Sequence, residues 1–165
     1  MKKVILSFLV MGLLIGGAFA RVQAQEKKAA FSLNLGVQTN LYQESSFDNA
    51  WFTLDARAGI ALGKSFEISP EVMAMVDDSL NFDAVWLYPG LMLNFKLGNL
   101  FVGAGAVLPI VIWERESDSG NPAPKVNIGY SAGHLTLTAY ILTRTEKYMD
   151  FLEVNFIGAT LGYKF

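Results

Sequence analysis

Few residues of this chain could do chemistry. The chain has one histidine, His134, and no cysteine. A hydrolase of the serine–histidine–carboxylate type needs a histidine beside a serine and a carboxylate, and the residue two places after His134 is Thr136 rather than a serine. The sequence has no His or Glu cluster with metal-ligand spacing. We therefore expect no catalytic residues, no metal and no cofactor.

Charged residues on two successive segments form a second candidate site. Apolar and polar side chains alternate along 52–62 and again along 66–76, as in half-buried β-strands. If a tight turn joins the segments as a hairpin, Arg57 faces Glu71 directly across the strands. The residues of this predicted ion-pair cluster, all on the polar face, are Asp55, Arg57, Glu67 and Glu71.

This cluster has two interpretations. As a structural feature, it satisfies buried charges and fixes the register of the hairpin. As a functional feature, it forms a gate or a proton path. We expect the structural role, in which case replacing Arg57 with alanine lowers resistance to heat or urea without altering ion conductance.

The elements that carry these residues are predicted to be eight strands with alternating short and long connections. Three tight connections contain Gly63, Gly98 and Gly133, and four longer ones are polar. In the last strand the alternation fails upstream, which predicts a bulge near Phe156. The alternating segments are 31–41, 52–62, 66–76, 85–95, 100–112, 126–132, 135–141 and 157–165.

The first 24 residues have the layout of a cleavable signal peptide. Two lysines precede an apolar run from Val4 to Ala20, and cleavage is expected after Ala24, with Ala20 as the alternative site. An uncleaved membrane anchor is the competing interpretation. We expect a signal peptide over 1–24 and a single barrel domain over 25–165.

Residues 25–165 keep 10 of the 13 basic residues and all 15 acidic ones, a balance that suggests no nucleic-acid partner.

Composition favours a barrel that crosses a membrane. The chain is 52% hydrophobic and 17% charged, yet it has no further apolar run of helix-spanning length. An even number of antiparallel strands, with short turns at one end and long loops at the other, is typical of a transmembrane up-and-down β-barrel, which leaves no unpaired backbone edge in lipid. The alternative is a soluble barrel of the lipocalin type with its apolar face inside. The scarcity of charges on the polar face favours the membrane barrel.

The chain ends in the sequence "YKF", with Tyr163 and Phe165 in the apolar phase. Over nearly all of 29–165 the chain resembles the small eight-stranded outer-membrane proteins of the OmpA/OmpX-like class, and this ending resembles the signature that the family's barrel-assembly machinery recognises. The resemblance implies a bacterial outer membrane, periplasmic termini, and contact with outer-membrane lipids and lipopolysaccharide. The outward aromatic belt expected at the inner rim comprises Phe31, Phe66, Phe95, Tyr163 and Phe165.

Six aromatic residues fall in the polar phase, mostly near the strand ends next to the longer loops. We expect them to form the outer interfacial belt of the membrane. The alternative is an apolar mouth for a small hydrophobic ligand. These residues are Tyr42, Trp51, Trp86, Tyr88, Trp113 and Tyr140.

An eight-stranded barrel has an interior that side chains can fill, so we expect no broad pore. We expect a structural or surface-interaction role, with loop 114–124 as the contact surface for an extracellular partner, since it is the longest connection and rich in charge, Gly and Pro. One alternative is a barrel that binds or transports small hydrophobic compounds. The other is a lipid-modifying outer-membrane enzyme.

Overall fold

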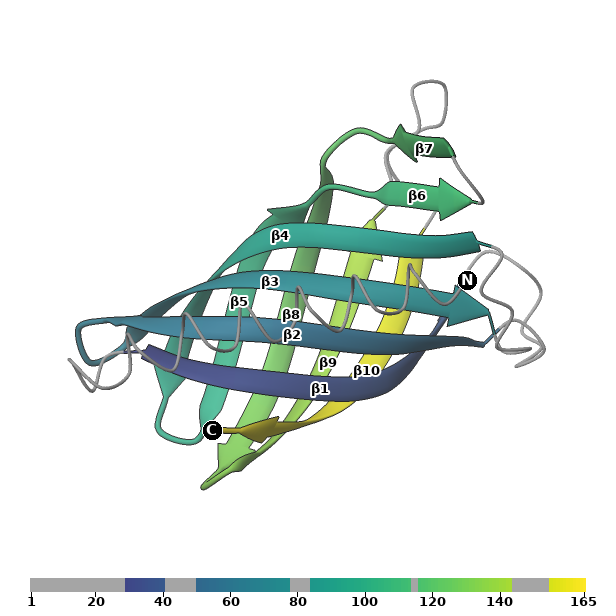
Figure 1. Cartoon of the computed structure of the whole chain (residues 1–165). Helices are drawn as coiled ribbons and strands as arrows, with labels where there is room; N and C mark the ends of the chain where they lie inside the picture. Colours follow the sequence, from purple (N-terminus) through teal and green to yellow (C-terminus); the bar gives the residue numbers. More distant parts are fainter. Residues whose placement is uncertain (1–28, 41–49, 78–83, 114–115, 144–154) are drawn as a thin grey trace.

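Antiparallel strands follow one another around a barrel (Figure 1). The computed structural model describes residues 29–40, 50–77, 84–113, 116–143 and 155–165. Within these ranges, no helix is long and apolar enough to cross a membrane. The strands are β1 (Ala29–Asn40), β2 (Trp51–Leu62), β3 (Phe66–Asp77), β4 (Ala84–Leu97), β5 (Leu100–Val107), β6 (Ile110–Trp113), β7 (Glu116–Ser119), β8 (Ala123–Ala132), β9 (Leu135–Thr143) and β10 (Asn155–Lys164).

These ten segments form eight barrel strands. β4 pairs with both β5 and β6, while β5 pairs with β8 and β6 pairs with β7. The β5–β6 and β7–β8 segments are therefore two barrel strands, each interrupted once. The sheet closes because β1 pairs with β10 and β3 pairs with β4. The prediction of an all-β, eight-stranded antiparallel barrel is confirmed.

Side chains alternate between the exterior and the interior of the barrel. Leu35, Leu137 and Leu161 are each about 60% exposed on the outside, at 67%, 58% and 60%. Many of the buried interior side chains are polar or charged, and the large aliphatic side chains point outward, in the reverse of a lipocalin-type arrangement. Among the residues that are less than 10% exposed are Asn34, Asp55, Arg57 and Glu71.

The three tight turns lie where the sequence predicts them. Gly63, Gly98 and Gly133 have φ angles of 79°, 65° and 59°, in the left-handed region that glycine adopts without strain. They lie at the end of the barrel where β1 begins and the chain terminates at Phe165, which we call the turn end. The opposite end, where β1 ends and β2 begins, is the loop end.

Two details differ from the sequence-based expectations. β10 pairs with β9 and β1 without interruption, so the bulge predicted near Phe156 is absent from the described part of that strand. The irregularity lies at Leu108–Pro109, where β5 gives way to β6. Proline has no N–H to donate to a ladder, which explains why the strand breaks there.

The expected loop 114–124 is mostly strand. Residues 116–119 form β7, which pairs with β6, and Ala123 and Pro124 begin β8. Glu114 and Arg115 lie outside the described residues. Figure 1 shows β6 and β7 beyond β4, where they extend the sheet at the loop end. We call this hairpin the β6–β7 arm.

Candidate functional site in the barrel lumen

The lumen consists of three successive layers. An apolar layer lies at the loop end, a layer of ion pairs lies below it, and a polar cavity lies at the turn end. Each layer draws on several strands, because neighbouring barrel strands contribute alternate residues to the interior.

Two carboxylates and two cations form the ion-pair layer. The Nη2 atom of Arg57 lies 2.8 Å from Oδ2 of Asp55, and its Nε lies 3.2 Å from Oε2 of Glu71. The other carboxylate oxygen of Glu71 lies 2.5 Å from Nζ of Lys125. These side chains are at most 7% exposed, so every charge is buried beside one of opposite sign. A buried charge without a partner would be costly, and this balance avoids that cost.

The register of the β2–β3 hairpin explains these contacts. Leu62 pairs with Phe66 across the turn, and Arg57 pairs with Glu71, as expected from the sequence. On the adjacent strand, the amide nitrogen of Asn34 donates to Asp55 at 3.3 Å. The network is therefore supported by three consecutive strands of the sheet.

Glu67 lies apart from this network. Its carboxylate pairs with Lys96 and accepts a hydrogen bond from the hydroxyl of Ser69 at 3.0 Å. Ser69 in turn accepts a bond from Asn94. The four residues predicted as one cluster therefore separate into two groups, with Glu67 nearer the turn end.

Sequence reasoning missed both lysines. Lys125 directly precedes Val126, which faces outward, so the alternation itself places Lys125 inside. The residues before it, 114–124, have the charge, Gly and Pro content of a loop, so the sequence alone predicts that the strand begins only at Val126. Lys96 lies between two outward residues, Phe95 and Leu97, and the same alternation would have placed it on the polar face.

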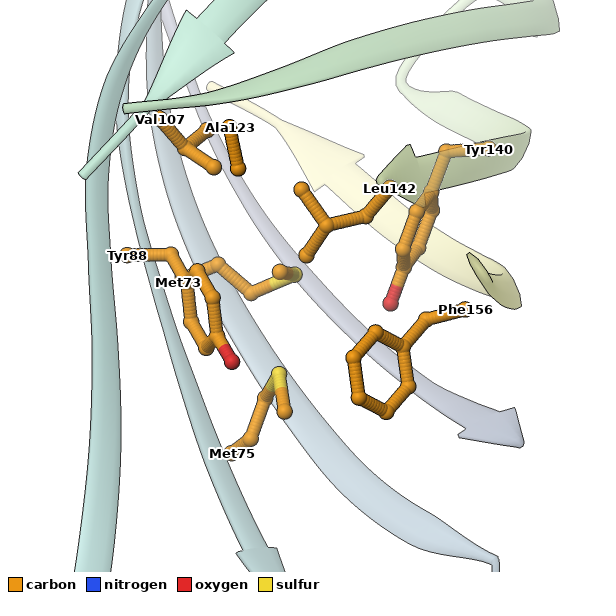
Figure 2. Close-up of a cluster of buried hydrophobic side chains, with 8 residues drawn as sticks. All are labelled: Met73, Met75, Tyr88, Val107, Ala123, Tyr140, Leu142 and Phe156. Atoms are coloured by element: carbon orange, nitrogen blue, oxygen red, sulfur yellow. The ribbon is translucent and has the colours of Figure 1, made fainter. Parts of the chain in front are cut away.

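Figure 2 shows the apolar layer, whose side chains converge from several strands. Trp51 and Trp86 pack against it and contact each other edge to face, with ring centroids 6.4 Å apart. Because sulfur-containing and aromatic side chains fill irregular gaps well, this layer packs closely. Its residues are Met73, Met75, Tyr88, Val107, Ala123, Tyr140, Leu142 and Phe156.

The expectation that the six polar-phase aromatics form an outer belt is wrong for those that can be placed. Tyr88 and Tyr140 are 2% and 3% exposed, and both lie inside the barrel. Trp51 and Trp86 pack on the same inward layer. These residues occupy the inward-facing positions of their strands, and the alternation of inward and outward side chains continues to the strand ends. Tyr42 lies outside the described residues, as does the side chain of Trp113, whose backbone belongs to β6.

Tyr140 joins the apolar layer to the ion-pair layer. Its hydroxyl donates to Oε1 of Gln38 at 2.8 Å, and Nζ of Lys125 lies 4.8 Å from the centre of its ring. Gly158, directly across the β9–β10 ladder, makes room for this ring. A Cβ atom at Gly158 would lie 2.3 Å from Cζ of Tyr140, so any other residue would displace the tyrosine.

The aromatic residues predicted to face outward at the turn end do so, and their rings contact one another. Tyr163 and Phe165 are 48% and 58% exposed, and their rings contact each other at 5.2 Å. Phe165 also contacts Phe31 at 5.9 Å, and Phe66 contacts Phe95 at 5.2 Å. His134 stacks on Tyr163 at 5.4 Å, and its Nδ1 lies 2.8 Å from the carbonyl oxygen of Lys164.

A closed eight-stranded barrel with apolar residues outside and polar residues inside has the fold of the small outer-membrane barrels. Neisserial surface protein A has this fold: it is 10% identical, with a TM-score of 0.55, over 82% of this chain and 95% of that one. A de novo designed transmembrane β-barrel is 13% identical, with a TM-score of 0.56, over 85% of this chain and 98% of that one. No protein-family model and no curated protein matches the sequence. At these identities the likeness shows the fold alone.

Proposed function

We propose that the protein is a barrel of a Gram-negative-type bacterial outer membrane, with a structural or surface-interaction role and no open pore. The observation that carries the proposal is the combination of an apolar exterior with a lumen closed by two packed layers. The ion-pair layer and the apolar layer together block the interior, since their side chains are almost fully buried.

The apolar exterior supports insertion into lipid. Large apolar side chains that are at least 36% exposed occur on every barrel strand. An apolar surface that encircles a water-soluble protein would drive aggregation, whereas the hydrocarbon of a bilayer accommodates it. The exposed residues include Leu35, Leu54, Val72, Leu93, Val102, Ile128, Leu137 and Leu161.

In this proposal the turn end faces the periplasm, together with both termini, after removal of residues 1–24 as a signal peptide. The aromatic belt around Phe165 supports an interfacial position, because tyrosine and phenylalanine rings gather at membrane boundaries. The terminal Phe165 is then available to the barrel-assembly machinery, and the exterior contacts outer-membrane lipids and lipopolysaccharide.

The surface-interaction role falls to the β6–β7 arm. It takes the place of the loop 114–124 expected from the sequence, and its strands pair beyond the point where β5 ends. A paired hairpin presents side chains to an extracellular partner in a fixed order, which a free loop does not.

The environment of His134 supports a role without catalysis. Its ring is stacked on Tyr163 and bonded to the backbone of β10, so it is engaged in packing the end of the chain. A lipid-modifying enzyme would need this histidine beside a nucleophile and a carboxylate.

Two measurements on the full-length protein test the proposal. The protein should be recovered in the outer-membrane fraction and migrate differently on a gel before and after boiling, as folded membrane barrels do. In planar bilayers it should give no steady conductance. Recovery as a soluble protein would contradict the membrane assignment, and discrete ion conductance would contradict the closed lumen.

A second candidate is binding of a small hydrophobic compound at the loop end. The inward position of Trp51 and Trp86, against a methionine-rich layer, favours it. Titration of the folded protein with apolar compounds should then quench tryptophan fluorescence saturably. Unchanged fluorescence with compounds that bind the protein would exclude the site.

A further inference from the structure

The turn end of the lumen contains a polar cavity of about 250 Å³. All eight barrel strands contribute to its lining, so it is the mouth of the lumen rather than a surface groove. The arginine of the ion-pair layer forms its inner boundary. The polar side chains that matter to its chemistry are Ser32, Arg57, Glu67, Lys96, Thr136 and Lys164.

Small side chains on two neighbouring strands leave room for the cavity. Ala30, Ser32 and Gly59 line it on β1 and β2, whereas methionine, leucine and tyrosine fill the loop end. Phe101 is the aromatic residue of the lining, and its ring lies over Gly129 on the neighbouring strand. A Cβ atom at Gly129 would lie 2.2 Å from the ring, so the glycine lets the ring lie against the wall.

The lining is more cationic than anionic. Three of its side chains are cations and one, Glu67, is an anion. Arg57 pairs with Asp55, and Lys96 pairs with Glu67. Among the described residues, no carboxylate forms an ion pair with the ammonium group of Lys164.

Hydroxyl groups lie beside these cations. Ser131 and Thr136 lie 3.5 Å apart across the β8–β9 turn, and both line the cavity with Ser32. Hydroxyls can donate to an anion, and a hydrogen bond between a cation and an oxyanion is about twice as strong as a neutral one.

We propose that this cavity binds a small oxyanion, such as phosphate or sulfate. Lys164 supplies the main charge, Lys96 adds a second donor, and the hydroxyls of Ser32 and Thr136 complete the coordination. The oxyanion is either a free ion or the terminal group of a larger molecule that enters from the turn end. This site lies at the opposite end of the lumen from the β6–β7 arm and does not depend on the proposed surface role.

Titration of the purified, folded full-length protein with inorganic phosphate at low ionic strength tests the proposal. We expect saturable binding by calorimetry or phosphorus NMR. Lys164→Gln should weaken binding about tenfold, because a charged hydrogen bond contributes about 1.5 kcal/mol or more. Glu67→Gln should tighten it, since the change removes the anion from the lining and releases Lys96.

Lys64→Gln is the matched control. Lys64 is an exposed lysine in the turn that contains Gly63, at the same end of the barrel but outside the cavity lining. Its replacement should leave the affinity unchanged. A parallel titration with glycerol phosphate distinguishes the two forms of the ligand. If glycerol phosphate binds more tightly than inorganic phosphate, the natural ligand is the terminal group of a larger molecule. If it binds equally or more weakly, the natural ligand is the free ion.

Two outcomes would overturn the proposal. One is the absence of saturable phosphate binding by wild-type protein whose folded state is verified by its migration on an unboiled gel. The other is an equal loss of affinity in Lys164→Gln and Lys64→Gln, which would reflect general surface charge. The gel also separates lost binding from lost folding in every variant.

Discussion

At the scale of single residues, the lumen depends on charges that satisfy one another. Glu71 is shared between Arg57 and Lys125, and Arg57 is shared between Glu71 and Asp55. A network of this kind contributes little net stability compared with apolar packing, but the loss of one member leaves another buried and unpaired. Its members are therefore expected to behave as a unit.

Replacement of Arg57 with alanine tests this dependence. The change leaves Asp55 without a cation and should lower the free energy of unfolding by about 3 kcal/mol, in the range of broken buried pairs. Urea unfolding of the protein in detergent, followed by tryptophan fluorescence, measures the effect. Lys64→Ala, an exposed control, should change stability by less than about 0.5 kcal/mol.

The same variant separates the structural role of the network from a gate. If the network holds the lumen together, Arg57→Ala leaves the bilayer non-conducting because the apolar layer still closes the interior. Steady conductance in this variant, with unchanged stability, would show that the ion pairs act as a gate.

At the scale of elements, the alternation of apolar and polar residues predicted most of the fold. It placed the strands, the three glycine turns and the register that brings Arg57 to Glu71. The alternation could not reveal the interruption at Pro109, because Ile110 and Ile112 continue the apolar phase on its far side. Nor could it show β7, whose serine and acidic residues pair with β6 without any apolar pattern of their own.

The candidate site was predicted less completely, for a physical reason. Neighbours along one hairpin follow from register, so the pairing of Arg57 with Glu71 could be derived. The contact between Glu71 and Lys125 joins strands far apart in the chain, across the lumen, and depends on how the whole barrel closes. Such contacts require the stagger of all the strands.

The end of β10 carries a prediction about assembly. Phe165 is exposed, so Phe165→Ala should leave refolding in detergent nearly unchanged. If the assembly machinery recognises the terminal ring, as the proposed function holds, the same change should lower the amount of assembled protein in cells. Phe66→Ala is the matched control, since Phe66 is a belt residue with comparable exposure, 47% against 58%. Quantification of folded protein in outer-membrane fractions compares the two variants. An equal loss in both would argue against a terminal recognition signal.

At the scale of the whole molecule, the barrel separates three environments. The exterior is apolar, the loop-end half of the lumen is packed with apolar side chains, and the turn-end half is polar and partly open. A wide pore would need small or absent side chains throughout the interior. The layered lumen instead fits a closed barrel whose two ends can have different binding properties.

The most direct test of this account is a spin-label scan of β9 in lipid bilayers. The chain contains no cysteine, so single replacements at each position from Leu135 to Leu142 can be labelled without background. Contact with membrane-dissolved oxygen should be high at Leu135, Leu137 and Ile141 and low at the alternate positions, such as Thr138, with a period of two residues. High oxygen contact at the alternate positions, or contact of Leu137 with a water-soluble relaxation agent, would contradict the orientation on which the account depends.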